Sequence, residues 1–341
     1  MQPDTTLYAI LFSSICHLIY MLERYYYYQE FIAALQRTIP HRTTLVNTIA
    51  DILSVDKDAV YRRLRSEVKF SFIEMALLAK NLGISIDGIV GIESEQSRPT
   101  MVNITRHLNP TALDYRMFQD YIDFLEHIKD EPETLLLSSG NIPPHYLIYD
   151  YEYIARFYTL CWSHFSSFGN PVPYREIILP EQMKVLQKNC CLYTRHIKTT
   201  HYVWDYTMFQ RAVECIKFFA KIGLINEEDV SLIKKDLVAL LNHIAKLAIT
   251  GRHEDTGNQV FIYISDILVE TNYSSIKTQN MTVGQFNTFI LNAISALDKE
   301  VYTEISAWIL ARRRMSTLIS VSGEKIRAGF LDTQRKLIDT L

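Results

Sequence analysis

Apolar residues recur at intervals of three and four along most of this chain, the spacing that places them on one side of an α-helix. The segments with this pattern are, in order, Tyr25–Arg37, Leu45–Leu53, Lys57–Arg65, Phe72–Gly83, Ala112–Ile128, Pro180–Leu192, Asp205–Lys221, a long helix capped by Asn226, Phe286–Leu297, Tyr302–Ile319 and Gly323–Leu341. Val260–Val269 and Tyr273–Thr278 are instead rich in β-branched and aromatic residues, which predicts a small β-hairpin. The sequence therefore predicts a mainly α protein with one sheet-like piece.

The pattern also divides the chain into domains. Residues 93–100 contain the polar, proline-ended stretch ESEQSRP, which is typical of a linker. It separates a helical domain, residues 26–92, from a larger helical body with the β-hairpin, residues 101–341. We expect the body to supply dimerisation, effector sensing or both.

Residues 1–25 form an apolar extension that precedes the first domain. Leu7–Leu22 is largely apolar, but it follows an acidic residue, contains His17 and is short for a membrane span. We therefore expect no membrane partner. Met21 is an alternative start, which would leave residues 1–20 outside the native protein.

The stretch Thr44–Arg65 is the most specific part of the sequence. Its first helix has Thr43 or Thr44 as the expected N-cap, and its second helix is capped by Asp56 after a short turn. On the second helix, Val60 and Leu64 fall on one side. Asp58, Tyr61, Arg62 and Arg65 fall on the other side, where they are available to a partner.

This stretch resembles the lambda-repressor and Cro type of helix-turn-helix domain. The matching residues are Ile49, Ala50, Leu53, Val55, Asp56, Val60, Arg62, Ala79, Leu82, Gly83, Ile84, Ser85 and Ile89. The sequence departs from the family at Ser54, where a glycine is usual in the turn, and at Asp56, where Ser or Thr is usual. The resemblance covers Gln29–Ile92 and implies a DNA-binding domain of four to five helices. More loosely, the whole chain looks like bacterial regulators that join such a domain to a long, mostly helical body.

The resemblance and the helical face together assign a DNA interface. The expected base-facing residues are Lys57, Asp58, Tyr61, Arg62 and Arg65. The expected phosphate contacts are Arg42, Thr43 and Thr44, at the start of the preceding helix. The leading hypothesis is a cytoplasmic, homodimeric transcriptional regulator that binds double-stranded DNA. The alternative is a protein-interaction scaffold that keeps the helix-turn-helix fold without binding DNA.

Composition and motifs do little to decide between a DNA-binding regulator and a protein-interaction scaffold. The chain has a net charge of −3, but residues 41–80 carry seven Lys/Arg against five Asp/Glu, or +2, which permits nucleic-acid binding without requiring it. An odd number of cysteines, five, fits free thiols in a reducing compartment. No nucleophile elbow, dinucleotide fingerprint or metal-ligand spacing is present, so we expect no enzyme, cofactor or metal. The aromatics of Tyr146–Phe168 are expected in the core, with an effector pocket as the alternative.

Overall fold

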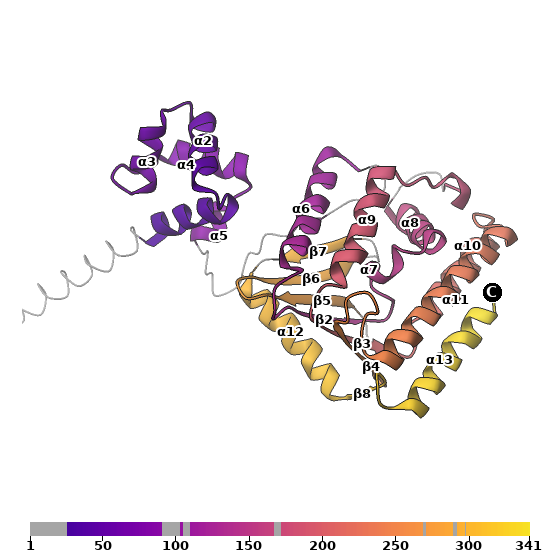
Figure 1. Cartoon of the computed structure of the whole chain (residues 1–341). Helices are drawn as coiled ribbons and strands as arrows, with labels where there is room; N and C mark the ends of the chain where they lie inside the picture. Colours follow the sequence, from indigo (N-terminus) through magenta and orange to yellow (C-terminus); the bar gives the residue numbers. More distant parts are fainter. Residues whose placement is uncertain are drawn as a thin grey trace, which may run out of the picture. The chain divides into compact units, whose positions relative to one another are not determined.

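The computed structural model describes residues 26–90, 103–104, 110–166, 172–268, 271–288, 292–296 and 298–341. The chain divides into two compact units, Met1–Met101 and Val102–Leu341 (Figure 1). The apolar extension 1–25 and the expected linker 93–100 lie outside the described residues.

The first unit consists of short helices. Residues 26–38 form the opening helix, and four more helices follow. These are α2 (Arg42–Leu53), α3 (Lys57–Leu64), α4 (Phe72–Leu82) and α5 (Ile86–Val90). The opening helix, α2, α3 and α4 each match a helix that the sequence predicts.

Local hydrogen bonds account for where these helices begin and end. The carboxylate of Asp56 accepts a hydrogen bond from the backbone of Ala59, 2.7 Å away, so Asp56 is the N-cap of α3 as expected. Ser71 and Glu74 form a reciprocal capping box at the start of α4. The expected N-cap of α2 is wrong, because the helix starts at Arg42 and His41 occupies the cap position without a side-chain hydrogen bond. Thr43 and Thr44 therefore lie in the first turn of the helix.

The second unit contains both helices and strands. Its helices are α6 (Ala112–Ile128), α7 (His145–Ile148), α8 (Glu152–Ser166), the 3₁₀ helix η1 (Tyr174–Glu176), α9 (Glu181–Thr194), α10 (Gln210–Lys221), α11 (Glu227–Thr250), α12 (Lys299–Arg314) and α13 (Glu324–Asp339). Its strands are β1 (Asn103–Ile104), β2 (Leu135–Gly140), β3 (Thr199–Asp205), β4 (Gln259–Ser265), β5 (Asn272–Lys277), β6 (Thr282–Thr288), β7 (Asn292–Ala296) and β8 (Ser316–Leu318).

The strands form one mixed sheet in the order β1-β7-β6-β5-β2-β3-β4-β8. Strands β2, β3 and β4 are parallel to one another, while β5 runs antiparallel to β2 and β8 runs antiparallel to β4. Helices connect β2 to β3 and β3 to β4, as parallel neighbours require.

This sheet contradicts the predicted fold class, since the second unit is not a helical body with a small hairpin. Val260–Val269 and Tyr273–Thr278 do contain strands, β4 and β5, but these strands do not pair, because β2 and β3 lie between them. Phe286–Leu297, predicted as a helix, contains the end of β6 and all of β7. The start of the predicted helix Asp205–Lys221 is wrong too, because Asp205 ends β3 and α10 begins at Gln210.

Alternating side chains give the sheet two different faces. Leu136, Tyr202 and Ile262 enter the large core that the sheet shares with α6–α11 and α13. Leu137 and Val203 point to the opposite face, where they pack against Ile305 and Ile309 of α12. Figure 1 shows α12 lying along the sheet apart from the other helices of this unit.

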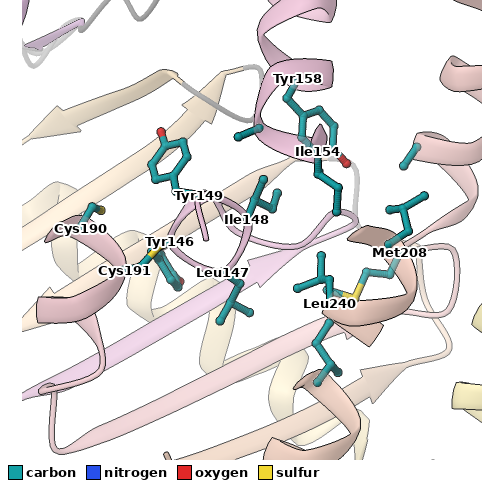
Figure 2. Close-up of a cluster of buried hydrophobic side chains, with 14 of the residues drawn as sticks. Tyr146, Leu147, Ile148, Tyr149, Ile154, Tyr158, Cys190, Cys191, Met208 and Leu240 are labelled. Atoms are coloured by element: carbon teal, nitrogen blue, oxygen red, sulfur yellow. The ribbon is translucent and has the colours of Figure 1, made fainter. Parts of the chain in front are cut away.

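The aromatic segment contributes mainly to the large core. Figure 2 shows Tyr146, Tyr149, Ile154 and Tyr158 packed among aliphatic and sulfur-containing side chains. The apolar residues of α11 that follow a coiled-coil spacing, from Ile233 to Leu247, enter the same core. Helix α11 is therefore packed into the core of the second unit.

Candidate nucleic-acid interface

Helix α3 is held by its buried side. Val60 is fully buried, and Tyr61 and Leu64 pack partly against the same core with residues of α2 and α4. Val55, in the turn before α3, also packs against this core. The aliphatic residues therefore fix which side of the helix faces outward.

The turn that joins α2 to α3 relies on a strained residue. Ser54 follows α2 with φ 52° and ψ 45°, in the left-handed region. Glycine enters this region without steric cost, whereas a residue with a Cβ atom does not. The serine that departs from the family pattern therefore adopts the conformation for which glycine is usual.

Tyr28 fixes the far end of α3 from the opening helix. Its hydroxyl donates to the carbonyl of Arg63 at 3.1 Å and accepts from the backbone N–H of Phe70 at 3.1 Å. Burial raises the pKa of this hydroxyl, so the group stays protonated and can donate. The sequence pattern did not predict this link.

Arg63 also belongs to the support of α3 and not to its outer face. Its guanidinium lies 2.7 Å from the Glu74 carboxylate, and both side chains are about four-fifths buried, with 17% and 20% exposed. Burial acts to raise the pKa of Glu74, but hydrogen bonds from Ser71 and Arg63 outweigh it and hold the pKa below its usual value. The pair therefore ties α3 to the start of α4.

The residues predicted to face bases lie on the outer side. Lys57, Asp58, Arg62 and Arg65 are exposed, and Tyr61 is half-buried. In the described part of the chain, neither Lys57 nor Arg62 has an ion-pair or hydrogen-bond partner for its side chain. These two cations are thus available to a ligand.

Arg65 differs from them because it is already paired. Its Nε lies 2.7 Å from Oε1 of Glu67, and its Nη2 lies 3.2 Å from Oε2. The hydrogen bond from Arg65 is the main cause that lowers the pKa of Glu67. Contact between Arg65 and DNA would require this exposed pair to separate.

Of the three residues predicted to contact phosphate, Arg42 has a direct contact with α3. The guanidinium carbon of Arg42 lies 5.9 Å from the centre of the Tyr61 ring. This cation–π contact joins the first turn of α2 to the outer side of α3. Arg42, Thr43 and Thr44 are exposed, and the first backbone N–H groups of a helix have no partner within the helix.

A small cavity in the second unit offers a weaker candidate site. It measures about 80 Å³ and is bordered by Glu152, Arg156, Arg175 and Lys184. Each of its three cations already has a carboxylate partner on the protein. An anionic ligand would have to displace these partners.

No family model, no curated protein and no solved structure matches this chain. None of the helices in the described ranges is both long enough and apolar enough to cross a lipid bilayer.

Proposed function

We propose that this chain is a sequence-specific DNA-binding transcriptional regulator that acts as a homodimer. The observation that carries the proposal is the outer face of α3, where Lys57 and Arg62 are exposed while Val60 anchors the helix to the core. Arginine and lysine are the side chains that most often read guanine edges and bind phosphate. A short helix with this face fits the major groove.

The proposal assigns different roles to the two helices. Lys57, Asp58, Tyr61, Arg62 and Arg65 of the α3 segment face the bases. Arg42, Thr43 and Thr44 contact phosphate, with Arg42 held near Tyr61. The second unit supplies dimerisation, effector sensing or both, and the protein acts in a reducing cytoplasm.

The test begins with selection of bound fragments from genomic DNA by the full-length protein. Arg62→Ala should weaken binding to a selected duplex by about 1–3 kcal/mol and relax the preference at one base pair. Lys80→Ala is the matched control, because Lys80 is an exposed cation on α4 that is not among the residues assigned to the interface. Equal binding by wild type and Arg62→Ala would refute the assignment of Arg62.

A protein-interaction scaffold is the second candidate, and one feature of the first unit favours it. Phe72, Ile73 and Leu77 on α4 are 76%, 70% and 42% exposed, so this helix carries an apolar outer face. Salt dependence separates the two candidates. A protein that neutralises phosphates loses affinity for random duplex steeply as salt rises, whereas a scaffold shows no such duplex binding.

A further inference from the structure

Helix α12 has an outer face that the sheet does not cover. Its principal contacts are with strands, through Ile305 and Ile309 on its inner side. Five residues on the other side recur at spacings of four and three, and they lie within an arc of about 80°. These residues, called the outer stripe, are Glu300, Glu304, Ala307, Ala311 and Arg314.

The chemistry of the outer stripe changes along the helix. Glutamates occupy its beginning, two alanines its middle and Arg314 its end. Glu304, Ala307 and Arg314 are exposed, and Ala311 is half-exposed. Within the described ranges, neither Glu304 nor Arg314 has an ion-pair partner.

An antiparallel copy of the same helix would complement this stripe. Glu304 and Arg314 are equally far from residue 309, and so are Ala307 and Ala311. A two-fold axis at residue 309 therefore sets Glu304 of one copy opposite Arg314 of the other, twice in the pair. The same axis sets Ala307 opposite Ala311, and small side chains let two helices approach closely.

We propose that the outer stripe of α12 is the interface through which two copies of this chain form a symmetric dimer. Such an interface is isologous, because the same surface is used on both subunits. The second copy is favoured over a nucleic acid because the stripe carries both signs of charge in a self-complementary order. The proposal does not depend on DNA binding by the first unit.

Trp308 borders the stripe and strengthens the choice of a protein partner. It is 49% exposed and makes an edge contact with Tyr273, with ring centres 6.2 Å apart. Because Trp308 is next to residue 309, the two-fold axis brings the two Trp308 side chains together on one flank. Met315, 61% exposed, lies on the same flank. Tryptophan, methionine and arginine are enriched at protein interfaces.

The test measures the mass of the full-length protein in solution by sedimentation equilibrium, without DNA. Wild type should be a dimer. Glu304→Arg and Arg314→Glu should each raise the dimer dissociation constant at least about tenfold, because each places like charges opposite one another twice. The double variant, with both charges exchanged, should recover the affinity of wild type within a few fold.

The double variant distinguishes the interface from a folding defect. A defect caused by either substitution would persist in it, whereas repulsion across the interface would not. Lys325→Glu, an exposed charge reversal on α13, should leave the dimer unchanged. A monomeric wild type, a dimer that neither single variant weakens, or a double variant that stays monomeric would each overturn the proposal.

Discussion

Three arginines near the end of α3 have different surroundings and therefore different roles. Arg62 is exposed, Arg63 is paired with partly buried Glu74, and Arg65 is paired with exposed Glu67. Position on the helix decides between Arg62 and Arg63, since a step of 100° moves a side chain from the outer side to the flank that faces α4. Because Arg63 and Arg65 are paired with carboxylates, Arg62 is the arginine of these three whose guanidinium is available to DNA.

Glu67 should weaken DNA binding by competing for Arg65. The carboxylate accepts two hydrogen bonds from the guanidinium and adds a negative charge beside the proposed interface. Glu67→Gln should therefore strengthen binding to a selected duplex about two- to fivefold, the scale of an exposed ion pair. Fluorescence anisotropy at constant salt measures this change.

Glu30→Gln is the control, because Glu30 is a carboxylate paired with Arg37 on the opening helix and not with a residue of the proposed interface. Equal or weaker binding by Glu67→Gln would show that Arg65 does not contact DNA.

The turn between α2 and α3 determines how firmly the outer face is held. Ser54→Gly should raise the stability of the first unit by about 0.5–1 kcal/mol, since the relief of left-handed strain exceeds the added flexibility of the unfolded chain. Hydrogen exchange of the α2 and α3 backbone measures the change. Ser71→Gly should instead lower the stability of the first unit, because Ser71 has an ordinary φ of −68° and its side chain caps α4. Faster hydrogen exchange in Ser54→Gly than in wild type would contradict the inference that Ser54 strains this turn.

Helices with clear caps could be predicted from the sequence because their signals are local. Asp56 and Asn226 each mark a helix start that the sequence predicts and the structure confirms. The outer side of α3 could be predicted for the same reason. The links from Tyr28 and Glu74 could not, since they join residues distant in the sequence.

Strands were missed where the local pattern was ambiguous. Strand β2 reads Leu-Leu-Leu-Ser-Ser-Gly without alternation, because this central strand is covered on both of its faces. Phe286 and Ile294 are eight residues apart, a spacing that two helical turns would also satisfy. In the structure they face each other across β6 and β7. Short apolar runs of this kind do not distinguish a helix from a strand.

At the scale of the whole molecule, the two units differ in how far their contacts reach along the chain. The first unit consists of helices that follow one another closely in sequence, so the helices could be predicted from the local pattern. The sheet instead places β2 between β3 and β5, and β5 lies more than 130 residues further along the chain. The proposed α12 interface exists only because this sheet fixes which side of α12 is exposed.

Buried histidines should make the stability of the second unit depend on pH. His145 and His253 are buried, and burial lowers the pKa of each to about 4. The unfolded chain takes up these protons near pH 6.5, whereas the folded unit does not until about pH 4. The contribution of these two histidines to the free energy of unfolding should therefore be constant above about pH 6.5. It should fall as the pH drops from about 6.5 toward 4.

Tryptophan fluorescence can follow this unit alone, because Trp162, Trp204 and Trp308 all belong to it. The melting temperature should be at least about 4 °C lower at pH 5 than at pH 7. Replacing both His145 and His253 with glutamine should make the slope shallower. Some slope should remain, because burial and Arg313 also lower the pKa of His201 to about 4. A slope as steep in the variant as in wild type would mean that other groups take up the protons when this unit unfolds.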